Sequence, residues 1–251
     1  APGAPIAFGY AGTLGVAGVP WQRGGAHLNQ PWGIAGDRDG VWIANAAGRS
    51  VLRFGAGALE ELGRAGDLDA LAGWPVRFVG DVAVVVHEVV PPGQSYPPRR
   101  TVWLVDAGGH TAIGIPIDNF GVSGAPTTLG RPDVAGDDAA HLRGPTGIAA
   151  DDEVVYVADT GNHRVQIFTV AGANLATIGQ TGVPGRGPGQ LDRPARLALG
   201  HDGRLYVADA GNHRVVAYDV TDPRTPRENQ SYGHPGTPGS GDDAFDTPLG
   251  V

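Results

Sequence analysis

Residues 156–165 read YVADTGNHRV, and residues 206–215 read YVADAGNHRV. The two copies differ at a single position and lie 50 residues apart. Two weaker copies follow the same pattern, WIANAAGR at 42–49 and WLVDAGGH at 103–110. Self-similarity at a period of about 50 residues indicates a repeat architecture, in which each unit buries its faces against its neighbours.

A proline opens each unit and a glycine closes it. The opening prolines are Pro31, Pro145, Pro194 and Pro248, and the closing glycines are Gly15, Gly130, Gly179 and Gly233. From the proline to the Asp or Asn of the repeat the spacing is 14, 14 and 15 residues in three units. From Pro75 to Asp106 it is 31, which predicts about 17 extra residues within 80–99.

Each unit reads as four short strands. The best-preserved unit predicts them at 147–150, 154–158, 164–169 and 175–178. The turn after the second strand contains Gly161 and Asn162, which tolerate positive φ. Four-stranded units of this length are propeller blades, so the sequence predicts an all-β propeller. The 42 Gly and 21 Pro of the chain fit its many tight turns.

The repeated stretch, together with GQLDRP at 189–194, resembles the NHL repeat. The resemblance is specific over 130–233, degenerate over 13–66 and poor over 66–100. It implies a β-propeller of four-stranded NHL-type blades, six in an intact ring. It also implies a function that is RNA or protein binding, extracellular sensing or metal-dependent lyase catalysis, and it does not choose among these.

The markers lay out one propeller domain over 1–251, with about four blades plus an incomplete one. The expected parts are an outer strand of the closing blade at 1–15, blades at 26–66, 67–130, 141–179 and 190–233, and the start of the next blade at 244–251. The blade at 67–130 is irregular and carries the insertion. We expect the ring to be completed by the rest of a longer protein or by a partner chain.

Bulk composition narrows the function. The net charge is −8, from 18 Lys+Arg against 26 Asp+Glu, which disfavours nucleic-acid binding. Without cysteine the chain has no thiolate metal site and no covalently attached haem. No apolar stretch reaches the ~20 residues of a membrane span. The first residues, APGAP, suit a mature end after removal of a signal peptide, so we expect an extracytoplasmic location: secreted, periplasmic or at the cell surface.

Polar residues of the repeat are interpreted first as structural. An acid pairing with an arginine across the turn would fix the hairpin, and Asn would bond nearby backbone. This applies to Asp159, Asn162, Arg164, Asp209, Asn212 and Arg214. His27 and His141 each stand four residues before an opening proline and are weak candidates for a zinc site, without a clear third ligand.

The candidate binding residues lie where the innermost strands line the central channel. They are Trp32, Arg77, Thr146 and Arg196. Arg77 and Arg196 replace the glycine of the Pro-x-Gly-Ile pattern, and an arginine beside an aromatic ring suits an anionic ligand or a peptide terminus. The alternative is that the arginine stems pack while their heads reach channel water.

The sequence as a whole favours a noncatalytic propeller that acts as a protein-binding, scaffolding or sensing module, as part of a larger protein or complex, and that needs no cofactor. The first rival is a metal-dependent enzyme of lyase or hydrolase type, with its site in the central channel. The second rival is RNA binding.

Overall fold

The computed structural model describes residues 31–37, 40–45, 50–55, 58–62, 79–87, 99–118, 121–122, 124–241 and 243–251. In these ranges the strands form antiparallel sheets, three with four strands and one with five. The first sheet contains β1 (Pro31–Asp37), β2 (Gly40–Asn45), β3 (Ser50–Gly55) and β4 (Ala58–Leu62). Each strand pairs with the next one along the chain, as expected when short turns join them.

The second sheet is the irregular one. It contains β5 (Val79–His87), β6 (Arg99–Asp106), β7 (Thr111–Asp118), β8 (Gly121–Val122) and β9 (Thr127–Gly130). The first four pair in chain order, and β9 pairs with β7 beside β8. The outer edge of this blade is therefore divided between two short strands.

The third and fourth sheets repeat one plan. The third contains β10 (Gly147–Ala150), β11 (Val154–Asp159), β12 (Arg164–Thr169) and β13 (Asn174–Ile178). The fourth contains β14 (Pro194–Leu199), β15 (Arg204–Asp209), β16 (Arg214–Asp219) and β17 (Arg227–Gly233). In the third sheet the four predicted strands are confirmed to within one residue at each end.

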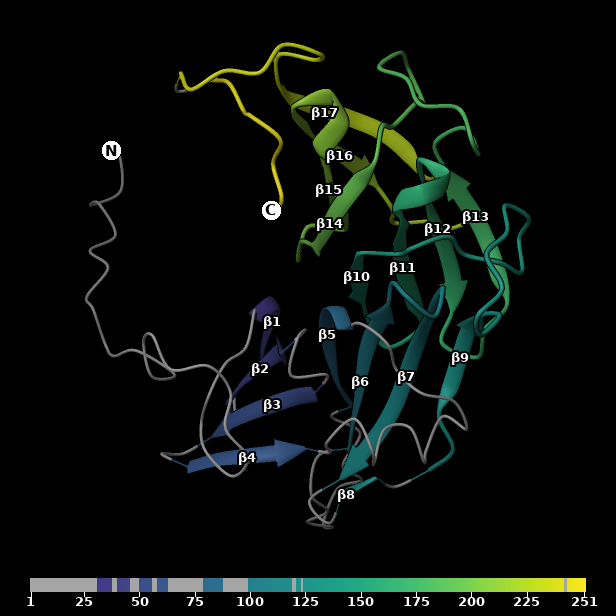
Figure 1. Ribbon diagram of the computed structural model, residues 1–251, viewed down its shortest axis with the longest axis vertical. Helices are drawn as coiled ribbons and strands as arrows, with labels where there is room; N and C mark the ends of the chain where they lie inside the picture. The colour runs from purple at the N-terminus through teal and green to yellow at the C-terminus, as the bar shows by residue number, and fades with distance from the viewer. Residues whose placement is uncertain are drawn as a thin grey trace.

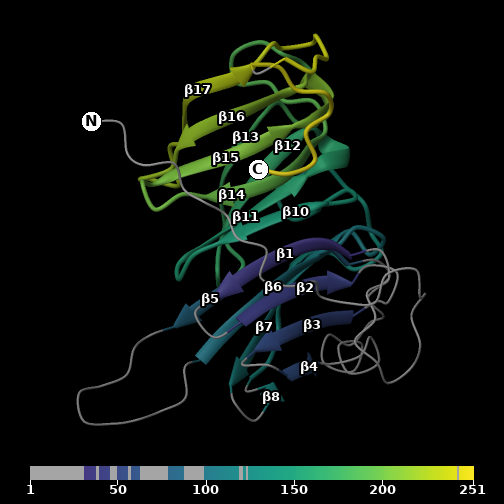
Figure 2. The same ribbon diagram turned by 90° about the vertical axis from the view of Figure 1, so that its left-hand side faces the viewer.

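The sheets fan out around a common centre, with β1, β5, β10 and β14 innermost (Figure 1). These innermost strands contact one another in that order. A view turned by 90° shows β14, β15, β16 and β17 following one another across a single blade (Figure 2). The arrangement confirms the predicted propeller of four-stranded blades.

The core lies between neighbouring blades. Tyr156 and Leu205 belong to the cluster between the third and fourth sheets, and Trp103 and Phe168 to the cluster between the second and third. A further cluster, around Trp42, joins the first two sheets. Because the sheets bury their faces against each other, each of these hydrophobic clusters is shared by two neighbouring blades.

The turn between the second and third strands differs from the expectation in one detail. Thr160–Asn162 form a short 3-10 turn, and the positive φ falls on His163 at 57°. His110 and His213 have φ of 59° and 56° in their own blades. The side chain of Asn162 is buried and bonded to Asp159, so the following histidine takes the left-handed conformation in its place.

Several sequence expectations fall partly or wholly outside the described residues. The outer strand at 1–15 does so entirely, as do His27 and Arg77. The expected insertion at 80–99 overlaps β5 and the first residue of β6, and 88–98 between them is not described. Residues 243–251 are described and form no strand. Within the described ranges, no helix is long and apolar enough to cross a membrane.

Candidate functional site

The repeated turn gathers three polar side chains inside the third sheet. Oδ2 of Asp159 accepts hydrogen bonds from Nδ2 of Asn162 and from Nε of Arg164, both at 2.8 Å. Its Oδ1 accepts one from the backbone N–H of Arg143 at 2.6 Å. The same contacts recur in the fourth sheet among Asp209, Asn212, Arg214 and the N–H of Asp192. Both carboxylates are fully buried.

The two arginines also hold the loop that enters their blade. The guanidinium of Arg164 donates to the carbonyl oxygens of Asp137, Asp138 and His141 at 2.7 to 3.1 Å. Arg214 donates in the same way to the carbonyl oxygens of Arg186 and Gln190. The charges of the two arginines are thus neutralised within the fold. The side-chain contacts of the Asp, Asn and Arg in both turns therefore fit a structural role.

The histidine after the turn contacts the segment that follows its blade. Nδ1 of His110 accepts a hydrogen bond from the backbone N–H of Gly144 at 3.0 Å. His163 accepts from Arg193 at 3.2 Å, and His213 from Thr247 at 3.0 Å. Nδ1 of His163 also lies 3.1 Å from Oδ1 of Asp192, and Nδ1 of His213 lies 3.4 Å from Oδ1 of Asp246. The histidine of the repeated turn therefore ties each of these three blades to the segment that follows it.

A second group of polar side chains lies where the innermost strands converge. Nη1 of Arg196, on β14, lies 3.4 Å from Oδ2 of Asp81, on β5. Arg196 also donates to the carbonyl oxygen of Thr146 and, at 2.7 Å, to that of Trp32. Its guanidinium carbon is 5.7 Å from the centre of the Trp32 ring, within the range of a cation–π contact. We call these four residues the axial cluster.

The axial cluster includes three of the four residues proposed for binding, because the register of the inner strands brings them together. Trp32 and Thr146 supply backbone carbonyls, and Arg196 supplies the charge. The hydroxyl of Thr146 instead donates to the carbonyl oxygen of Ala195 at 3.0 Å. The fourth candidate, Arg77, is not described.

Asp81 is the member that sequence reasoning missed. The residue just before the Asp or Asn of the repeat pairs with Gly33 in the first sheet, with Asp81 in the second and with Gly147 in the third. In the fourth sheet Arg196 directly precedes Leu197, which pairs with Val207. The positions of Gly33, Asp81, Gly147 and Arg196 are thus equivalent in the four blades. A usable signal existed: an apolar residue and an alanine follow each of them. Alignment on Pro75 assigned this position to Arg77 instead.

Glycine at this position allows close packing of the inner strands. A Cβ on Gly33 would overlap Oδ1 of Asp81, and a Cβ on Gly147 would overlap the carbonyl oxygen of Ala195. Two blades therefore contribute glycine, and the other two contribute an acid and a base that meet near the axis.

Burial sets the electrostatics of the pair. Burial raises the pKa of Asp81 to about 6, although the Arg196 guanidinium and the N–H of Ile148 oppose the rise. Burial also lowers the pKa of Arg196, and the Asp81 carboxylate partly offsets that change. Arg196 already contacts a carboxylate and two carbonyl oxygens. These contacts favour a role in holding the blades together over a role in binding an anionic ligand.

The exposed part of this region is apolar. Trp32 is 50 % exposed and Ile34 is 69 % exposed, both on β1. Gly33, between them, faces Asp81, and the register of β1 shifts between Pro31 and Gly33, which places Trp32 at a β-bulge. The contact with Arg196 holds the Trp32 ring in place.

The proposed metal ligands do not form a cluster in the part of the chain that is described. Nδ1 of His141 lies 2.7 Å from Oδ1 of Asp138, and His27 is not described. No group of three or more His, Cys, Asp or Glu side chains with metal-binding proximity occurs among the described residues.

Comparisons with known proteins agree with this architecture. The family model for the NHL repeat matches residues 142–168 and 191–218, which lie in the third and fourth blades. No curated protein matches the chain.

Among solved structures, a streptogramin B lyase is 18 % identical with a TM-score of 0.50, over 80 % of this chain and 54 % of that one. An auxiliary nutrient binding protein from Bacteroides ovatus is 16 % identical with a TM-score of 0.56, over 82 % and 50 %. A protein of unknown function from Bacteroides thetaiotaomicron is 14 % identical with a TM-score of 0.53, over 90 % and 64 %. The chain spans about half to two thirds of their lengths. At these identities the likeness is one of fold.

Proposed function

Because the chain is a β-propeller built of NHL repeats, we propose that it is a noncatalytic module that binds a protein partner through the exposed side of β1. The observation that carries this proposal is the pair of exposed apolar side chains, Trp32 at 50 % and Ile34 at 69 %. Large aromatic side chains on a rigid support contribute disproportionately to protein interfaces.

The support under Trp32 strengthens the proposal. The guanidinium of Arg196 donates to its carbonyl oxygen and lies over its ring. A ring held before binding loses little conformational freedom when a partner covers it. The apolar side chains of Trp32 and Ile34 on this inner strand therefore offer a preformed contact.

Site-directed photocrosslinking tests this proposal. A photoreactive residue is placed at Ile34 of the 251-residue chain, and a second one at Val134, which is 49 % exposed in a loop. We expect crosslinking in the source cells to yield one defined protein adduct from position 34. The adduct should disappear when Trp32 is replaced by Ala. Adducts that are the same from both positions, or that survive Trp32→Ala, would contradict the proposal.

The enzyme alternative is supported by the similarity in fold to a streptogramin B lyase. No group of three or more potential metal ligands among the described residues supports it. Metal analysis of the purified protein separates the two readings. Stoichiometric Zn²⁺ or Ca²⁺ that is lost on replacing His141 would replace our proposal with a metal-dependent activity. RNA binding is tested by titration with single-stranded RNA at two salt concentrations, since phosphate contacts weaken steeply with salt. The extracytoplasmic location stays a prediction.

A further inference from the structure

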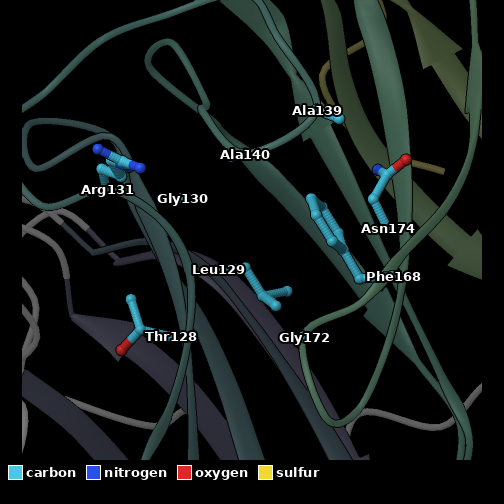
Figure 3. A pocket seen from close by; sticks show the side chains of 9 residues that line it. All are labelled: Thr128, Leu129, Gly130, Arg131, Ala139, Ala140, Phe168, Gly172 and Asn174. Carbon is cyan, nitrogen blue, oxygen red and sulfur yellow. The ribbon is translucent and has the colours of Figure 1, made fainter.

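A cavity opens between the second and third blades, away from the axial cluster. It has a volume of about 380 Å³, near the lower end for small-molecule sites. One wall is β9 with the residue after it, the other is formed by β12 and β13, and the loop at Ala139 and Ala140 borders it (Figure 3). Its position at a blade interface gives it rigid walls.

The base of the cavity is apolar and its rim carries a cation. Leu129 and Phe168 are 2 % and 3 % exposed, and their side chains lie between the two walls (Figure 3). Arg131 is exposed, and it forms no ion pair or hydrogen bond through its side chain with any described residue. It is the sole charged residue lining the cavity in the described part of the chain.

A chain of amide hydrogen bonds fixes the polarity of Asn174 on the opposite wall. Nε2 of Gln166 donates to the carbonyl oxygen of His141 at 2.8 Å, and Nδ2 of Asn174 donates to Oε1 of Gln166 at 2.8 Å. Since a carbonyl can only accept, the order of the donors is determined. Nδ2 of Asn174 is thereby engaged within the fold, and the residue is exposed at the edge of the cavity.

At the next blade interface the equivalent positions carry residues that bond within the chain. Tyr218 stands at the place of Phe168, and Glu228 at the place of Asn174. Oε2 of Glu228 accepts a hydrogen bond from the N–H of Gly189 at 3.3 Å. Gln180, which replaces Arg131, accepts one from Nε2 of Gln190 at 3.1 Å. There the chain's own carboxylate and amides tie the loop to the blade.

We propose that the cavity between the second and third blades binds a carboxylate that carries an apolar group. The carboxylate pairs with Arg131, and the apolar group contacts Leu129 and Phe168. N-acylated apolar amino acids and the C-terminal residue of a peptide share this chemistry. The site is independent of the protein-binding surface at β1.

Calorimetric titration of the 251-residue chain tests the site with N-acetyl-leucine as the probe. We expect saturable binding with one site per chain. N-acetyl-leucine amide, which lacks the charge, should bind at least about tenfold more weakly, because a charge-assisted hydrogen bond is lost. No binding of the acid, or equal binding of acid and amide, overturns the proposal.

Two variants and a control locate the binding. Arg131→Gln should weaken the acid by about tenfold and leave the amide unchanged. Ala139→Phe should abolish both by filling the cavity without a change of charge. Arg193→Gln removes an arginine with 64 % side-chain exposure from the next loop and should leave binding unchanged. Thermal unfolding of each variant shows that it is folded. Loss of binding in the control, or retention in both test variants, contradicts the site.

A second probe separates the two sources of the ligand. N-acetyl-glycyl-glycyl-leucine presents the same carboxylate at the end of a peptide. Binding at least as tight as that of N-acetyl-leucine supports a peptide terminus as the ligand. Binding about tenfold weaker supports a small free acid, because the longer body then fails to enter the cavity.

Discussion

Nη1 of Arg196 lies 3.4 Å from Oδ2 of Asp81, and the two residues belong to blades that a third blade separates. The ion pair reaches across the innermost strand β10, where the N–H of Ile148 also donates to Asp81 at 3.1 Å. The inner strands of three successive blades are thereby fixed to one another by a single carboxylate. The protonation of Asp81 should therefore affect the stability of the second, third and fourth blades together.

The pH dependence of stability follows from the raised pKa of Asp81. The folded value is about 6 and the ordinary value is 3.8. The folded state therefore holds the proton more tightly than the unfolded state. Proton binding to Asp81 therefore stabilises the folded state. This stabilisation is complete below pH 3.8 and is lost as the pH rises through about 6. A difference of about two pKa units corresponds to about 3 kcal/mol.

Asp81→Asn should remove this pH step. Urea unfolding of both proteins at pH 4 to 7 measures it, and the free energy of unfolding of wild type minus that of the variant should fall by up to about 3 kcal/mol across this range. Two curves that stay parallel over the range would show that Asp81 does not titrate there.

Loss of a turn arginine should strongly destabilise the chain. Arg164→Ala leaves the buried Asp159 carboxylate without its charge partner and removes the hydrogen bonds that the guanidinium donates to three loop carbonyls. We expect a loss of about 3–5 kcal/mol in the free energy of unfolding. Arg193→Ala, at an exposed side chain, should change it by about 0.5 kcal/mol or less. A similar effect for both variants in denaturant unfolding would refute the structural role of the turn.

The glycine of the inner strand can be tested by a single methyl group. Gly147→Ala places a Cβ against the carbonyl oxygen of Ala195, and we expect a loss of about 1–3 kcal/mol from the forced shift of the strands. Gly250→Ala is the control, because a Cβ there meets open space. Thermal unfolding compares the two, and equal midpoints would mean that the inner strands are not closely packed.

The histidine contacts predict a local change in hydrogen exchange. His213→Ala removes the acceptor for the N–H of Thr247, so exchange at that amide should accelerate while the global stability falls by about 1 kcal/mol. His201→Ala, at an exposed turn residue, should leave both unchanged. Unaltered exchange at Thr247 in the first variant would contradict this contact.

The repeat pattern was sufficient to predict the blade and its turn. A Val- and Tyr-rich strand, a Gly-Asn turn and a closing glycine recur at fixed spacing, and the four strands of the third sheet lie where this pattern placed them. The pairing of Asp159 with Arg164 could also be anticipated, because the two residues occupy the first and last positions of the same turn and face each other in the ladder.

Asp81 could not be placed from the proline marker, because its blade begins at Val79 and the marker proline at Pro75 precedes β5 by four residues. The partnership of Asp81 with Arg196 depends on the closure of four inner strands about one axis, which spacing along the chain does not encode. The cavity was missed for a related reason. It is lined by residues of two neighbouring blades, Leu129 from one and Phe168 from the other, and these meet only once the blades are stacked.

The most direct test of the account is the affinity of the crosslinked partner for the 251-residue chain and two matched variants. Trp32→Ala removes the exposed ring at β1, and Val134→Ala removes an exposed apolar side chain from a loop. The account predicts that the dissociation constant rises at least about thirtyfold for Trp32→Ala, as expected for a central interface aromatic, and less than about threefold for Val134→Ala. Equal affinities of wild type and Trp32→Ala would contradict the claim that β1 is the binding surface.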